Sequence, residues 1–98
     1  MKLIRKDNLL RFYCPGCELK HTLNDTWNFN NDYEKPTITP SIKVVGYNNE
    51  ENMYYVCHLY ITDGNIIYLS DCTHNLLGQT IPMVECESWD LWEKNNDL

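Results

Sequence analysis

The stretch MYYVCHLYITDGNIIYLSDCTH, residues 53–74, contains two runs rich in β-branched and aromatic residues, joined by the dipeptide Asp63-Gly64. Such runs are typical of strands, and Asp-Gly supplies the positive φ values that a two-residue hairpin turn needs. We therefore expect residues 53–62 and 65–72 to pair as antiparallel strands. This hairpin indicates a β fold.

Side chains alternate between the two faces of a hairpin, so the turn also predicts which residues point together. With a two-residue turn, Cys57 and Cys72 share one face, and His58 and Asp71 share the other. Cys57 and His58 are then not expected to bind the same ion. The same alternation brings His74 to the side of Cys57.

The rest of the chain has the pattern of short strands, at residues 1–6, 9–13, 20–24 and 41–47. Prolines limit the crossing segment before residue 41 to edges or loops. A chain of 98 residues without linker or repeat supports one domain, 1–98. We predict an all-β or mainly β domain of antiparallel strands and hairpins, with at most short helical turns and a zinc-ribbon-like staple.

The composition indicates the cell compartment of the protein and excludes some kinds of partner. Five cysteines are an odd number, the N-terminal segment MKLIRKDNLLRFYC has charges that break every apolar run, and no stretch is long enough to span a membrane. We expect a soluble protein with reduced thiols in the cytoplasm of its host cell. The net charge of −6 repels phosphate backbones, so no direct contact with nucleic acid and no membrane partner is expected.

The segment FYCPGC, residues 12–17, places two thiols around a Pro-Gly turn. A thioredoxin-type redox pair would begin a helix, whereas a strand pattern follows here. Pro15 and Gly16 suit the middle positions of a type II turn, and two thiolates on a tight turn form half of a zinc site. With two ligands from elsewhere, we predict a closed tetrahedral Zn²⁺ site formed by Cys14, Cys17, Cys57 and His74.

Three other residues remain alternative ligands or orienting partners of that site. His21 lies on the strand after the turn, His58 follows Cys57, and Cys72 precedes His74 by two positions. Cys86, beyond Pro82, is expected to be a free structural thiol.

The blocks FYCPGC, WNFN, KPTITPSI, CH, ITDG, LSDCTH and LLGQT, over residues 12–81, resemble a family of small proteins of tailed phages and prophages. The automated label of that family, ammonia monooxygenase, implies a membrane-embedded multisubunit enzyme and does not suit so short a chain. Matched residue by residue, the resemblance singles out Cys14, Pro15, Gly16, Cys17, His21, Trp27, Pro36, Pro40, Ser41, Cys57, His58, Asp63, Gly64, Asp71, His74, Gly78 and Gln79. At Cys72 the chain departs from the family, where serine is commoner.

Size, acidity, zinc motif and phage character also resemble a zinc-containing anti-CRISPR protein of type II-A systems. That resemblance implies a non-enzymatic monomer or weak dimer that binds and inhibits a host defence protein, namely a type II CRISPR-Cas nuclease. The alternatives are a zinc-ribbon-like nucleic-acid-binding protein, favoured by the basic N-terminus, and a zinc-dependent hydrolase with Asp71 near His74 as the base.

The C-terminal segment VECESWDLWEKNNDL combines acidic residues with two tryptophans that are three positions apart. One face of a short helical turn beginning at Ser88 could carry both indoles. They either pack onto the sheet or, ringed by acids, form a contact surface for a basic partner. The residues of this candidate partner-binding surface are Glu87, Trp89, Asp90, Trp92 and Glu93.

Overall fold

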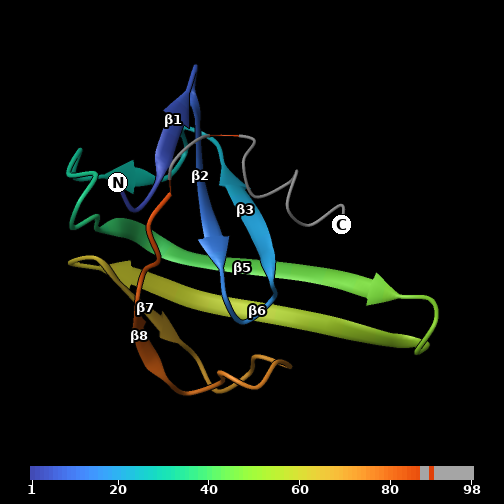
Figure 1. Cartoon of the computed structure of the whole chain (residues 1–98). Coiled ribbons are helices and arrows are strands. Elements are labelled where there is room, and N and C mark those ends of the chain that lie inside the picture. The colour runs from blue at the N-terminus through green and yellow to red at the C-terminus, as the bar shows by residue number, and fades with distance from the viewer. Residues whose placement is uncertain (87–88, 90–98) are drawn as a thin grey trace.

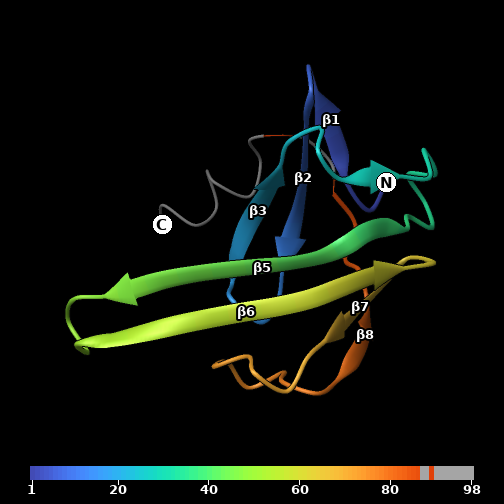
Figure 2. The same cartoon turned by 180° about the vertical axis from the view of Figure 1, so that it is seen from behind.

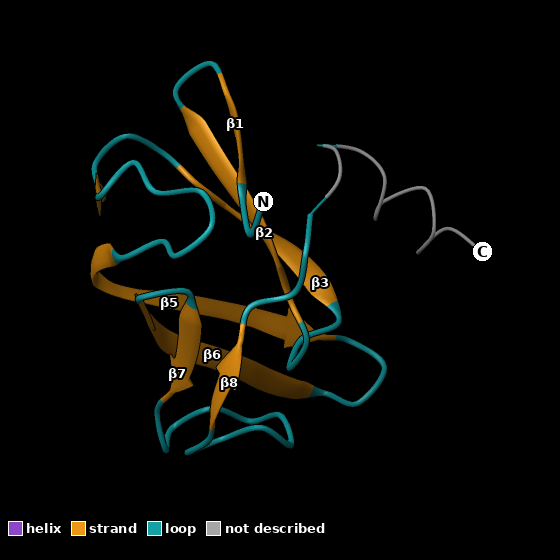
Figure 3. Ribbon diagram, turned by 60° about the vertical axis from the view of Figure 1, so that its left-hand side comes forward, coloured by secondary structure: helices purple, strands orange, loops and turns teal. Residues whose placement is uncertain are grey.

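The computed structural model describes residues 1–86 and 89, and in this part of the chain every regular element is a strand (Figures 1 and 3). A three-stranded antiparallel sheet has the order β1-β2-β3, and a five-stranded antiparallel sheet has the order β4-β5-β6-β7-β8. The strands are β1 Ile4–Lys6, β2 Leu9–Cys14, β3 Leu19–Leu23, β4 Asn28–Phe29, β5 Ile38–Asn48, β6 Met53–Thr62, β7 Asn65–Tyr68 and β8 Thr80–Pro82. The predicted β fold is confirmed, and no helix that could cross a membrane occurs among the described residues.

The predicted hairpin forms with the expected register. Thr62 pairs with Asn65 and Leu59 pairs with Tyr68 across the β6–β7 turn. Asp63 and Gly64 have φ values of 50° and 80°, the positive angles that this turn requires. β7 ends at Tyr68, but the chain stays beside β6, because the Leu69 amide donates to the His58 carbonyl over 2.9 Å.

The core lies where β2 and β3 cross the long β5–β6 ribbon (Figures 1 and 2). Buried side chains alternate with more exposed ones along β2 and the second half of β6, so each strand turns one face inward. The fully buried residues come from both sheets and include Phe12, Cys14, Ile42, Cys57, Leu59, Ile61, Ile66 and Tyr68. Two thiols therefore lie inside the core, close to where the sheets meet.

β5 has an irregularity in its pairing with β6 that includes Ser41. Ile38 pairs with Ile61 and Ile42 pairs with Leu59, so residues 39–41 stand opposite Tyr60 alone. A bulge of this kind bends the strand and changes the direction of side chains, and bulges are common beside active sites. Ser41 comes at the end of this irregularity, two positions before Lys43, the partner of His58, so alternation along β5 places it on the outer face that carries His58.

Near the C-terminus the structure describes Trp89 but not the other residues of the predicted partner-binding surface. Glu87, Asp90, Trp92 and Glu93 lie outside the described residues. The ring of Trp89 is half-buried, with the Arg11 guanidinium 4.1 Å and the Lys6 ammonium 5.8 Å from its centre. This indole therefore packs on basic side chains of the first sheet.

Candidate active site and metal centre

Three side chains on the outer face of the five-stranded sheet form a continuous hydrogen-bonded chain. His58 Nε2 lies 3.2 Å from Ser41 Oγ. On the other side of the ring, His58 Nδ1 lies 3.1 Å and 3.0 Å from the two carboxylate oxygens of Asp71. A hydroxyl, an imidazole and a carboxylate are thus joined in the order that nucleophilic catalysis requires.

Each of the three residues is positioned by a different element. β5 carries Ser41 on its outer face, two positions before Lys43, and β6 carries His58, the partner of Lys43, on the same face. Asp71 follows β7, and its neighbour Cys72 ties this segment to β6. The Cys72 thiol accepts a hydrogen bond from the His58 amide and donates one to the His58 carbonyl, each over 3.2 Å. Cys72 therefore holds the backbone of the histidine and places Asp71 beside its ring.

The charge of Asp71 suits this arrangement. The hydrogen bond from His58 is the main cause that lowers the pKa of the Asp71 carboxyl from its ordinary value. The ammonium of Lys43, 3.9 Å from Asp71 Oδ2, acts in the same direction. An ionised Asp71 accepts a hydrogen bond from the N–H at His58 Nδ1, and Nε2, which then carries no proton, can accept the hydroxyl proton of Ser41.

A cluster of side chains that could bind a metal lies on the inner face of β6, where Cys57 directly precedes His58. The candidate ligand atoms of Cys14, Cys17, His21 and Cys57 lie within 4.8 Å of one another. Cys14 Sγ and Cys57 Sγ are 3.8 Å apart, and none of the five cysteines is in a disulfide. Zinc–sulfur bonds of about 2.3 Å at tetrahedral angles put two sulfurs about 3.8 Å apart. The cluster can therefore hold a metal ion between the two sheets.

His21 is the imidazole that the structure places in this group of four. It lies on β3 opposite Phe12 and is 6% exposed. Its Nε2 is buried and has no hydrogen-bond partner among the described residues. A buried nitrogen without a partner is costly unless something binds it, and a metal ion held by the three thiols would do so.

His74, the fourth ligand expected from the sequence, lies at the edge of the cluster, where it groups with Cys57 and Cys72. Its Nδ1 accepts the Leu76 amide over 3.2 Å, so the neutral ring carries its proton on Nε2. Nε2 lies 3.4 Å from Cys57 Sγ, so its N–H can donate a hydrogen bond to that sulfur. The Tyr68 hydroxyl lies 3.1 Å from Cys14 Sγ and gives a second sulfur a similar partner.

The Pro-Gly turn differs from the predicted type II geometry. A type II turn needs a positive φ at Gly16, but the positive φ in this segment, 56°, belongs to Glu18. Gly16 is required for another reason. A Cβ atom there would lie 2.4 Å from the ring of His74, so only glycine lets the turn approach that histidine.

Without a metal, the thiols share their charge unequally. Hydrogen bonds from Cys17 and Cys57 hold the pKa of Cys14 well below its usual value. The interaction with Cys14 raises the pKa of Cys17 to about 12, and it also raises that of Cys57. A divalent cation would stabilise the thiolate form of all three sulfurs.

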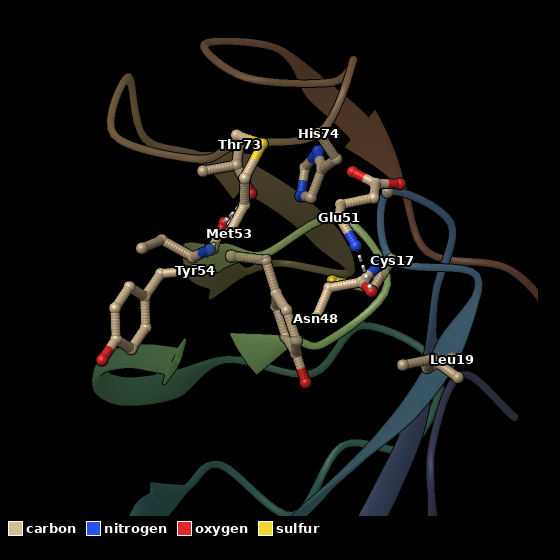
Figure 4. Close-up of a pocket in the computed structure, with 11 residues that line it drawn as sticks. Cys17, Leu19, Asn48, Glu51, Met53, Tyr54, Thr73 and His74 are labelled. Atoms are coloured by element: carbon tan, nitrogen blue, oxygen red, sulfur yellow. Dashed lines mark hydrogen bonds between the residues drawn. The ribbon is translucent and has the colours of Figure 1, made fainter. Parts of the chain in front are cut away.

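A pocket of about 480 Å³ lies between the Pro-Gly turn and the tip of the β5–β6 hairpin (Figure 4). Cys17 and His74 line it together with Leu19, Asn48 and Tyr54. None of Ser41, His58 and Asp71 lines this pocket. The hydroxyl–imidazole–carboxylate chain therefore lies outside this pocket, on the open face of the sheet.

The hydrogen-bonded chain of serine, histidine and aspartate has the geometry of the serine hydrolases that use a catalytic triad. Residues 2–69 match a family model described as the bacterial ubiquitination-like system serine protease (BubE), and the chain belongs to this family. The matched segment includes Ser41 and His58, and Asp71 follows two residues after it. A search of curated proteins found no match. A search of solved structures also found none.

The family corrects one expectation from the sequence. The prediction that the protein is not an enzyme is wrong, because the family is described as one of serine proteases. Asp71, considered above as a base beside His74, contacts His58 instead. The resemblance to phage and anti-CRISPR proteins and the binding of a CRISPR-Cas nuclease are tested by neither the structure nor the comparisons and stay predictions.

Proposed function

We propose that this protein is a serine protease in which Ser41 is the nucleophile, His58 the general base and Asp71 the residue that orients and stabilises the histidine. Ser41 Oγ attacks the carbonyl carbon of a peptide bond while His58 Nε2 takes the hydroxyl proton. The imidazolium, stabilised by Asp71, returns that proton to the leaving amine. Water, activated by His58 in the same way, then hydrolyses the acyl-enzyme.

The contact of His58 with both Ser41 and Asp71 is the observation that carries this proposal. The family description supplies the substrate class, since a protease cuts a polypeptide. The same description names a bacterial ubiquitination-like system, so we assign the substrate to the proteins of such a system.

We further propose that the metal is zinc and that Cys14, Cys17, Cys57 and His21 hold it. Three thiolates and one imidazole form a closed site with no position for substrate, which gives the metal a structural role. Bound zinc supplies folding free energy, about 10–16 kcal/mol in small zinc peptides, against a total stability of about 5–15 kcal/mol for a typical domain. Cys57 lies next to His58, so zinc would also fix the strand that carries the general base.

Hydrolysis of an activated ester, p-nitrophenyl acetate, tests the assignment without knowledge of the natural substrate. We expect the parent protein to release p-nitrophenol and the variants Ser41→Ala and His58→Ala to lose at least about 100-fold in rate. Ser70→Ala, at an exposed serine, is the matched control and should match the parent. Equal rates in Ser41→Ala and the parent would show that Ser41 is not the nucleophile.

A further inference from the structure

The strand that carries Ser41 has one open edge. On one side β5 pairs with β6, at Ile38 and from Ile42 to Asn48. On its other side β4 pairs only with Ile38 and Thr39. From residue 42 to residue 48, no backbone among the described residues other than that of β6 bonds to β5. A row of backbone donors and acceptors about 20 Å long therefore faces outward.

This open edge begins directly after the nucleophile. The carbonyl of Ser41 accepts the indole N–H of Trp27 over 3.4 Å, and Trp27 immediately precedes β4. β4 and Trp27 thus occupy the edge on one side of Ser41, and the edge is open on the other side. A polypeptide could extend along β5 from Ser41 toward Asn48, but not in the opposite direction.

The edge also lacks the features that usually prevent strand addition. Natural edge strands are protected by charges, prolines or short length. Residues 42–48, IKVVGYN, contain no proline and a single charge, that of Lys43. The unprotected edge is long, and it lies in an 11-residue strand.

On the outer face, the side of the triad, the edge presents apolar side chains at alternate positions. Val45 is 57% exposed and Tyr47 is 43% exposed. The ring of Tyr47 packs edge-on against that of Tyr54 on β6, with centroids 4.9 Å apart. An added strand would place every second side chain beside this row, where apolar residues fit best.

We propose that the substrate binds as an additional β-strand along residues 42–48, with its scissile carbonyl at Ser41 Oγ. This inference rests on the proposed protease function. It assigns the substrate to extended segments, such as tails or loops, that have apolar side chains at alternate positions on one side of the cleaved bond. Main-chain hydrogen bonds supply the affinity, and the row beginning at Val45 supplies the selectivity.

The test uses peptides as probes. The parent protein is incubated with a library of peptides from a bacterial lysate digested with trypsin, and cleaved bonds are identified by mass spectrometry. The best-cleaved peptide is then synthesised with single N-methyl groups on successive backbone amides. N-methylation removes one donor and blocks close pairing, so we expect kcat/KM to fall at least about fivefold at every second position. These positions should all lie on one side of the scissile bond.

Three results would overturn the inference. The first is a fall in kcat/KM when N-methyl groups are placed at consecutive positions, or at positions on both sides of the scissile bond. The second is a dimer in sedimentation analysis that buries this edge against a second copy. The third is absence of any cleavage in the library although a fluorophosphonate probe labels Ser41. Absence of fluorophosphonate labelling would instead refute the protease function itself, which separates the two failures.

Discussion

Replacement of Asp71 by asparagine removes the charge that orients His58 and changes almost nothing else. Asp71 contacts His58 Nδ1 through both carboxylate oxygens, and an amide would present its NH₂ group there in one of its orientations. The histidine then carries its proton on Nε2, where it cannot accept the proton of Ser41. In a buried triad this substitution lowers kcat by about 10⁴-fold.

The expected loss is smaller here, because the Asp71 side chain is 47% exposed and water screens its charge. We expect kcat for the activated ester to fall by about 100- to 1,000-fold. The melting temperature and zinc content should change little, because the side chain is at the surface. Asp25→Asn, at another exposed aspartate, is the control and should match the parent.

The pH dependence gives a second readout of the same pair. The His58 hydrogen bond lowers the pKa of Asp71, so its contribution to stability is complete above the ordinary pKa and is lost as the pH falls through the lowered one. Protonation of Asp71 should therefore lower the rate only at a pH below the ordinary pKa of an aspartate carboxyl. If Asp71→Asn keeps the parent kcat, Asp71 does not orient the base and the triad assignment fails.

The remaining predictions concern the metal and the thiols. Elemental analysis should find one zinc per chain, and Cys57→Ser should lower zinc content, melting temperature and esterase rate together, whereas Cys86→Ser should change none of them. In a chelator titration, His21→Ala should lose zinc more readily than the parent, and His74→Ala should retain it. The opposite result would show that the fourth ligand is His74. Cys72→Ala should lower kcat with zinc retained, because the His58 amide loses its acceptor, and Cys72→Ser should restore the rate. Loss of zinc from Cys72→Ala would make Cys72 a ligand instead.

The hairpin and the thiol cluster were predictable because local signals determine them. Asp63-Gly64 sets the β6–β7 register, and alternation from that turn places Cys57 inside the sheet and His58 outside. The same reasoning could also have predicted that His21 lies beside the thiols. Phe12 pairs with His21 and Cys14 pairs with Leu19, so Cys14 and His21 share the inner face of the β2–β3 hairpin.

The hairpin also predicted that His58 and Asp71 share a face, but the pairing of His58 with Ser41 was not predictable in this way. Ser41 lies on the face of His58 through the β5–β6 register, in which Lys43 pairs with His58. The polar loop between these strands has no dipeptide such as Asp-Gly that would determine this register, and Ser41 has no local motif such as the Gly-x-Ser-x-Gly of other hydrolases. Strand β8 was missed for a related reason, since three residues that end in Pro82 give little strand signal.

The central claim is that Ser41 is an activated nucleophile, and phosphonylation tests it most directly. The protein is incubated with a fluorophosphonate, digested and mapped by mass spectrometry. The account predicts one adduct per chain, on Ser41, that is lost in His58→Ala although the serine is still present. An adduct on another residue, or labelling of Ser41 that does not depend on His58, would contradict it.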